Sequence, residues 1–212
     1  AFPFGTSREI DIAYATVRAT RLTYVGELGW ELYIPAELAQ GVYDEIVAAG
    51  AAFGLCHAGY HALDSLRMEK AYRHWGHDIT DEDTPIEAGL SFAVAWDKPD
   101  GFIGREALLR QREAGPRQRL VQFKLADPEK LLYHNEPIWR DGVIVGYLRS
   151  GSYGHGLGAA IGLGYIHDPA GGVVDAAFVN AGSYTIEVAC EQVRAVASLR
   201  PLYDPRSERI RA

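Results

Sequence analysis

The sequence predicts an α+β protein, in which an antiparallel sheet with helices is followed by a C-terminal antiparallel β-barrel. In the first half, apolar residues recur at helical spacing in several segments. From about residue 117 onward the apolar runs are short and separated by turn signals, which is typical of a small barrel or sandwich. Gly115-Pro116 separates the two patterns, and this dipeptide ends helices. We therefore expect two regions, 1–115 and 116–212.

The composition excludes several classes of function. The 212 residues carry a formal net charge of −7, with both signs interspersed and no basic block. This argues against nucleic acid or an acidic membrane surface as a partner. There is no run of about 18 apolar residues, so we expect no membrane-spanning segment. Residues 1–7 lack the basic start and apolar centre of a signal peptide. We expect a cytoplasmic protein, or one of the mitochondrial matrix if the source is eukaryotic.

The sequence offers no clear metal or nucleophile site. Cys56 and Cys190 lie far apart without metal-type spacing, so we expect free thiols, with a disulfide as the alternative. His74, His77 and Asp78 are loosely spaced and have no second ligand cluster to support them. We predict no metal, and we expect these side chains to satisfy loop backbone groups or to line the edge of a site. Catalytic residues stay unassigned, because no Ser-His-Asp or Cys-His arrangement can be identified.

The elements of the first half follow from the spacing of apolar residues. Residues 1–12 show little periodicity, whereas 17–25 alternate as in a strand. The later segments with a regular pattern are a helix from Pro35 to about Gly50, a helix from about His61 to Tyr72, a strand from Phe92 to Trp96 and a helix from Gly104 to Glu113. Residues 74–90 are too polar for the core and are expected to form a loop.

Residues 24–33 predict a tight hairpin with glycines on both sides of its tip. In that register Tyr24 lies opposite Glu31 on one face, while Val25 and Trp30 share the other face and anchor the hairpin in a core. An aromatic phenol beside a partly buried carboxylate would suit a ligand with N–H donors. The alternative is a structural hairpin with a solvated Glu31.

The second half predicts a barrel or sandwich of short strands. Asp141-Gly142 is a strong hairpin signal. The glycine-rich residues 150–158 lack the Gly-Lys-Ser/Thr ending of a phosphate loop, so we predict a sharp turn, with a contribution to a ligand mouth as the alternative. The predicted strands are 119–125, 143–149, 159–166, 184–189 and 193–199.

Four stretches in order, 24–33, 59–70, 76–80 and 84–90, resemble the glycine-cleavage T-protein family, the folate-dependent aminomethyltransferases. Residues 69–78, Glu-Lys-Ala-Tyr-Arg-His-Trp-Gly-His-Asp, are most similar to the C-terminal folate module fused behind flavin domains in dimethylglycine and sarcosine dehydrogenases. The resemblance covers essentially the whole chain. It implies that residues 1–115 are the C-terminal part of a folate-binding α/β region and that 116–212 are the family's C-terminal barrel.

The resemblance also implies which residues touch folate. Tyr24 and Glu31 match folate-contacting positions of the family, and a carboxylate can accept two adjacent N–H groups of a pterin edge. In the helix, Leu63 stands where the family has a folate-contacting arginine, which puts that contact in doubt. Arg67, one turn later, is the candidate to take its place.

The function implied by the resemblance is tetrahydrofolate-dependent one-carbon transfer, of an aminomethyl or methylene group from a methylamine-type donor. The family's catalytic aspartate lies upstream of the part that Ala1 matches. The alternative is therefore a non-catalytic folate-binding or assembly module that needs an upstream flavin domain or a partner protein. We expect no flavin in this chain itself, because it has no strand-Gly-x-Gly-x-x-Gly-helix pattern.

Overall fold

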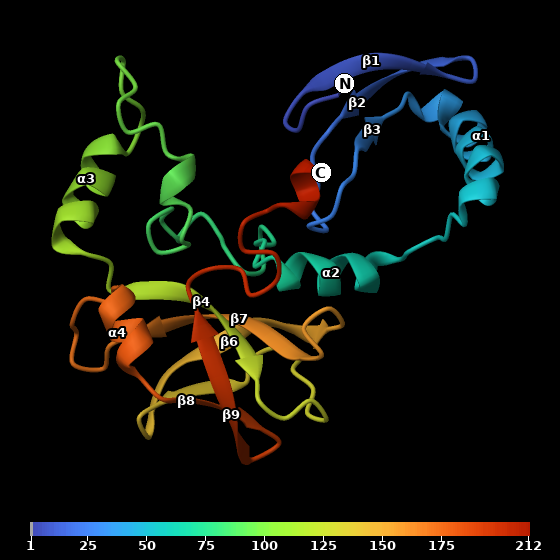
Figure 1. Ribbon diagram of the computed structural model, residues 1–212. Coiled ribbons are helices and arrows are strands. Elements are labelled where there is room, and N and C mark those ends of the chain that lie inside the picture. Colours follow the sequence, from blue (N-terminus) through green and yellow to red (C-terminus); the bar gives the residue numbers. More distant parts are fainter. Residues whose placement is uncertain (1) are drawn as a thin grey trace. The chain divides into compact units, whose positions relative to one another are not determined.

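A computed structural model describes residues 2–212 of the chain (Figure 1). These residues form two compact units. One holds the chain up to Asp64 together with Arg206–Ala212, and the other holds Ser65–Pro205. The boundary predicted at Gly115-Pro116 does not coincide with this division, so it stays a prediction about sequence modules.

The first unit is built on a three-stranded antiparallel sheet with the order β1-β2-β3. One face of this sheet is apolar and packs on helix α1 (Figure 1). Val17 of the sheet and Val42 of the helix are almost completely buried in this contact. The elements are β1 (Ser7–Ile12), β2 (Ala15–Thr20), β3 (Glu31–Tyr33), the short 3-10 helix η1 (Ala36–Leu38), α1 (Ala39–Gly50) and η2 (Ala51–Phe53).

The second unit contains a closed six-stranded barrel with the order β4-β7-β6-β5-β8-β9, which confirms the predicted barrel. All of its neighbouring strands pair antiparallel. Alternate side chains point inward and form the largest apolar core, with Phe123, Ile138 and Ile186 fully buried. The strands are β4 (Gln118–Leu125), β5 (Pro137–Arg140), β6 (Val143–Gly154), β7 (Ala159–His167), β8 (Tyr184–Val188) and β9 (Glu191–Ser198).

The predicted turns between barrel strands are confirmed. Asp141 and Gly142 join β5 to β6, and both adopt positive φ, 51° and 85°, as a type I′ hairpin turn requires. The glycine-rich stretch ends in a turn between Gly154 and Ala159, which pair at the end of the β6–β7 ladder.

Helices make up most of the remaining regular structure. The helices predicted after Pro35, near residues 61–72 and near 104–113 are confirmed as α1, α2 and α3. None of the helices in residues 2–212 combines the length and the apolar character needed to cross a membrane. The elements not yet given are α2 (Tyr60–Glu69), η3 (Ser91–Ala93), α3 (Arg105–Ala114), α4 (Ala176–Ala181) and η4 (Arg209–Arg211).

Two predictions in the first half are wrong. The apolar run Phe92–Trp96 is not a strand, because the Trp96 indole donates to the Ser91 carbonyl at 3.0 Å and folds the segment into a compact turn. Phe92 is 85% exposed there. Residues 7–12, for which no element was predicted, form strand β1, since a neighbouring strand supplies the hydrogen bonds that a local pattern does not show.

Candidate functional site

The sheet of the first unit has two chemically different faces. Paired residues share a face, so Thr20 and Glu31 lie on the same side as Arg18 and Tyr33. The first strand adds to this side Ser7 opposite Thr20 and Glu9 opposite Arg18. Helix α1 covers the apolar side of the sheet. The other side is polar and carries acidic groups, a cation, hydroxyls and a phenol.

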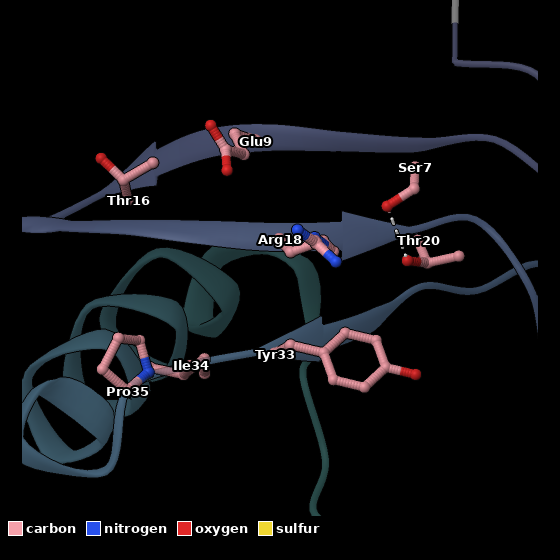
Figure 2. Close-up of a pocket in the computed structure, with 8 residues that line it drawn as sticks. All are labelled: Ser7, Glu9, Thr16, Arg18, Thr20, Tyr33, Ile34 and Pro35. Carbon is pink, nitrogen blue, oxygen red and sulfur yellow. Dashed lines mark hydrogen bonds between the residues drawn. The ribbon is translucent and has the colours of Figure 1, made fainter.

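A shallow cavity of about 580 Å³, wide open to solvent, lies on this polar face (Figure 2). Its walls come from all three strands and from the chain that follows β3. Ser7 and Thr20 are joined across the two strands by a hydroxyl–hydroxyl hydrogen bond of 3.0 Å. The lining residues are Ser7, Glu9, Thr16, Arg18, Thr20, Tyr33, Ile34 and Pro35.

Glu31 lies beside this cavity and is oriented by its neighbour on the same strand. The Tyr33 hydroxyl donates to Oε2 of Glu31 at 3.0 Å. This hydrogen bond and the negative charge of the carboxylate raise the pKa of the Tyr33 phenol, so the phenol stays a donor. Oε1 of Glu31 has no hydrogen-bond partner among residues 2–212. A half-buried carboxylate with one fixed and one open oxygen can accept further donors from a ligand.

The tight hairpin predicted for residues 24–33 is wrong. β2 ends at Thr20, which pairs with Glu31, so residues 21–30 form a longer connection. Tyr24 lies in this connection and not on a strand opposite Glu31. Trp30 is 47% exposed and does not anchor a core.

Contacts with distant parts of the chain explain the longer loop. The Arg21 guanidinium donates to the Phe2 carbonyl at 2.6 Å and also to the Ala212 carbonyl. Arg21 lies 5.8 Å from the centroid of the Trp30 ring. The loop is therefore closed by residues at both ends of the chain, which a prediction from local turn signals does not include.

Arg67, the third predicted contact residue, is completely buried in the second unit. Its guanidinium forms an ion pair with Asp78 and donates to the Ser150 hydroxyl at 3.0 Å and to the Tyr72 carbonyl at 3.1 Å. Asp78 in turn accepts from Ser150 at 2.5 Å and from the backbone N–H of His74 at 2.9 Å. Arg67 thus ties the loop after α2 to strand β6.

The two charged residues that follow in α2 and just beyond it are buried in the same way. The Glu69 carboxylate accepts the Leu157 N–H of the β6–β7 turn at 2.9 Å. Lys70, fully buried, pairs with Asp204 at 3.2 Å. Gln122 of β4 donates to the Met68 carbonyl at 2.6 Å. Polar contacts therefore hold the last turn of α2 on the barrel.

The prediction that residues 74–90 lie outside the core is wrong in part, because Asp78, Ile86 and Ala88 are buried.

Residues 2–212 contain no group of three or more His, Cys, Asp or Glu side chains placed to hold a metal ion. His74, His77 and His134 lie edge to face, with centroid separations of 5.8 and 6.3 Å. Asp78 satisfies a backbone N–H of its own loop, which was the interpretation favoured over a metal site. Cys56 and Cys190 are exposed free cysteines.

Comparison with known families accounts for nearly the whole chain. The model of the GCVT N-terminal domain matches residues 1–98, and the model of the glycine cleavage T-protein C-terminal barrel domain matches residues 118–204. The chain belongs to the glycine-cleavage T-protein family. The barrel of the second unit is therefore the T-protein C-terminal barrel, and the polar sheet face lies in the T-protein N-terminal domain.

Individual relatives of this T-protein family chain are longer than the chain itself. Mitochondrial sarcosine dehydrogenase of Homo sapiens is 46% identical over 211 residues, which is 100% of this chain and 23% of that protein. The formaldehyde-forming 4-methylaminobutanoate oxidase of Paenarthrobacter nicotinovorans is 42% identical over 204 residues, covering 96% of this chain and 24% of that protein. The chain thus spans about a quarter of the length of these relatives.

A solved structure shows the same fold. The glycine cleavage system aminomethyltransferase T from Bartonella henselae superposes with a TM-score of 0.75 at 24% sequence identity. The match covers 91% of this chain and 50% of that one. The α+β architecture with a C-terminal barrel is thus a T-protein fold.

Part of the polar face of this T-protein domain was not predicted from the sequence. Glu9, Arg18 and Tyr33 line the cavity, and none of them was predicted as a site residue. The signal was present in the sequence, because polar and apolar residues alternate through Glu9–Ile12 and Thr16–Thr20. Their common face becomes evident only when the strands are paired.

Proposed function

We propose that this chain is part of a tetrahydrofolate-dependent one-carbon transfer module and that its polar sheet face contacts the reduced pterin. The observation that carries the proposal is the Glu31 carboxylate beside the 580 Å³ cavity. A pterin presents adjacent N–H donors, and a carboxylate is their natural acceptor through charge-assisted hydrogen bonds. When bound, tetrahydrofolate supplies the nitrogen nucleophile that accepts the one-carbon unit.

The contribution of the residues in this chain is binding and orientation. Glu31 accepts N–H groups through its open oxygen while Tyr33 fixes the other oxygen at 3.0 Å. Such fixed acceptors hold a ligand in one orientation, which is how an enzyme lowers the entropic cost of a two-substrate reaction. Tyr24, in the loop that precedes β3, is proposed as a second contact with the pterin ring.

Arg67 is proposed to support the fold of the second unit and not to contact folate. Its guanidinium is fully buried and engaged with Asp78, Ser150 and Tyr72. It therefore fixes the loop of residues 73–80 on the barrel.

The donor class follows from the relatives. The names of two of them refer to sarcosine and 4-methylaminobutanoate, which are N-methylated amino acids. We propose that the one-carbon unit reaching this chain comes from a donor of that class. The mitochondrial location in the name of the first relative belongs to that protein, and we propose it here only for a eukaryotic source.

A second function is favoured by the limited coverage of the relatives. Because the chain spans 23% of sarcosine dehydrogenase, it is alternatively a folate-binding or assembly module that acts with an upstream flavin domain. Isothermal titration with tetrahydrofolate tests the binding that both functions share. Formation of methylenetetrahydrofolate faster than the uncatalysed reaction, from an iminium donor already at the methylene oxidation level, then distinguishes them. Binding without product supports the folate-binding module. Absence of binding contradicts the transfer function and the folate-binding module, and leaves only the assembly role.

A further inference from the structure

The polar face contains two opposite charges, on residues paired across two strands, that are not bonded to each other. Glu9 of β1 lies directly opposite Arg18 of β2, and both line the cavity (Figure 2). Among residues 2–212, neither side chain forms an ion pair. Both side chains are exposed, so their charged groups are available to a ligand.

We propose that Glu9 and Arg18 together bind the zwitterion of a small amino acid. This is the amino-acid part of a donor that arrives already oxidised to its iminium and leaves as the amine once its methylene has passed to tetrahydrofolate. The Arg18 guanidinium receives the carboxylate through paired N–H donors, and the Glu9 carboxylate receives the ammonium group. This inference rests on the proposed function, because it names the substrate that shares the cavity with the pterin.

The register supports a small ligand. Residues directly opposite on antiparallel strands have Cβ atoms roughly 4.5–5.5 Å apart. Two long side chains anchored at that spacing can hold the two charges of an amino acid between them. A ligand with only one charge would leave the other group uncompensated, so the pair selects zwitterions over simple anions or amines.

The same register places this pair next to the pterin acceptor. Arg18 lies opposite Tyr33, and Tyr33 donates to Glu31 at 3.0 Å. Arg18 and Glu31 are diagonal cross-strand neighbours, whose backbone positions are roughly 7–8 Å apart. An amino acid on Arg18 and a pterin edge on Glu31 would therefore be adjacent. The terminal carboxylates of folate lie at the far end of the ligand from the pterin. The distance between Arg18 and Glu31 is too short for Arg18 to bind these carboxylates while Glu31 binds the pterin.

Calorimetric titration of the purified protein with N-methylglycine tests the proposal. We expect saturable binding that Arg18→Gln weakens by about 10- to 100-fold, the usual effect of losing hydrogen bonds to a charged group. Glu9→Gln should weaken it similarly. The amide of N-methylglycine, which lacks the carboxylate, should bind weakly and should not respond to Arg18→Gln. Binding of N-methylglycine should also fall with added salt, since the subsite is exposed.

Arg8→Gln is the matched control. Arg8 pairs with Ala19, so it lies on the opposite face of the same sheet, and its substitution removes the same charge. We expect Arg8→Gln to bind N-methylglycine like the wild type. Equal losses in Arg8→Gln and Arg18→Gln, unchanged binding in Arg18→Gln, or no saturable binding by the wild type would overturn the proposal.

Titrations with pterin ligands show whether Arg18 binds the carboxylate of an amino acid or that of the folate tail. They also test the zwitterion site and the proposed folate function separately. Suppose that Arg18→Gln weakens tetrahydrofolate, but neither N-methylglycine nor a tetrahydropterin without the benzoylglutamate tail. Arg18 then binds the folate tail, and the zwitterion site is overturned. If the wild type binds N-methylglycine through Arg18 but binds no tetrahydropterin, the zwitterion site stands and the proposed folate function fails.

Discussion

The Glu31 carboxylate is oriented by a single hydroxyl, that of Tyr33, two residues further along the same strand. Alternate residues of a strand share a face, so this contact needs no unusual backbone. One oxygen of Glu31 accepts a hydrogen bond from the protein, and the other is open to a ligand. Removing either the charge or the hydroxyl therefore affects binding by a different amount.

Glu31→Gln keeps the shape of the side chain but removes its charge and one acceptor oxygen. We expect tetrahydrofolate binding to weaken by about 1.5–3 kcal/mol, the worth of a hydrogen bond to a charged group. Tyr33→Phe removes only the orienting hydroxyl and should weaken tetrahydrofolate binding less than Glu31→Gln does. Titration calorimetry on the three proteins measures both effects. Identical affinities for wild type and Glu31→Gln would eliminate the role assigned to Glu31.

Arg67→Met leaves the Asp78 carboxylate buried without its cation. We expect the free energy of unfolding to fall by about 3–5 kcal/mol, because an uncompensated buried charge is costly. Adding Asp78→Asn should recover part of this loss, since the remaining group is then neutral. Urea denaturation of the two single variants and the double variant measures the coupling between Arg67 and Asp78.

The surface pair of Lys130 and Glu191 provides the control for that series. Both residues lie in the second unit, and their side chains are 34% and 65% exposed. Hydrogen bonding to Glu191 raises the pKa of Lys130, yet solvent screens the pair, so Lys130→Met should lower the free energy of unfolding far less than Arg67→Met does. If Arg67→Met costs no more than Lys130→Met, burial does not govern the stability of the Arg67–Asp78 pair.

At the scale of elements, the turn between β5 and β6 depends on backbone conformation alone. Gly142 has φ 85°, and a Cβ placed there meets no atom within 4 Å. Gly142→Ala therefore introduces no clash, but it puts an L-residue in the left-handed region, which costs about 1–2 kcal/mol. We expect the free energy of unfolding of the barrel unit to fall by that amount in urea titrations.

Gly41→Ala should have the opposite sign. Gly41 lies within α1, has no positive φ, and also has open space around its Cβ position. Alanine there should stabilise the first unit by roughly 0.5–1 kcal/mol, through the lower conformational entropy of the unfolded chain. A decrease in stability from Gly41→Ala, or no change from Gly142→Ala, would contradict the backbone argument.

The elements that sequence predicted well are those fixed by local chemistry. The turn at Asp141-Gly142 and the periodic helices carry their signals within a few residues. The strand predicted for residues 92–96 is wrong because this apolar segment does not pair with another strand. The hairpin predicted for residues 24–33 is wrong because Arg21 holds the loop through contacts with Phe2 and Ala212, which are distant in sequence.

The candidate site was predictable only in part for the same reason. Glu31 was identified from the family resemblance, and it does lie on a polar face beside a cavity. Glu9 and Arg18 join that face through the pairing of β1 with β2, which no local pattern specifies. Arg67 was assigned to the site from the family resemblance, but it is buried against the Asp78 and Ser150 side chains, which come from later in the chain.

At the scale of the whole molecule, the chain consists of two compact units of different architecture. We expect them to open separately in hydrogen exchange. Amides of the central barrel strands β6 and β7 should be most protected, because both strands are paired along their length within a closed sheet. Amides of residues 21–30, which have no strand ladder, should exchange first. A single exchange rate shared by both units would contradict this.

The buried end of α2 also restricts how such chains can be recombined. Arg67, Glu69 and Lys70 are satisfied by Asp78, Leu157 and Asp204, all from the barrel unit. A crossover at Gly115-Pro116 between two divergent homologues would join one parent's charges to the other parent's acceptors. A chimaera that takes the barrel from one parent should therefore take the end of α2 from the same parent. The crossover that preserves these contacts lies before Ser65, and not at Gly115-Pro116, where the sequence pattern changes.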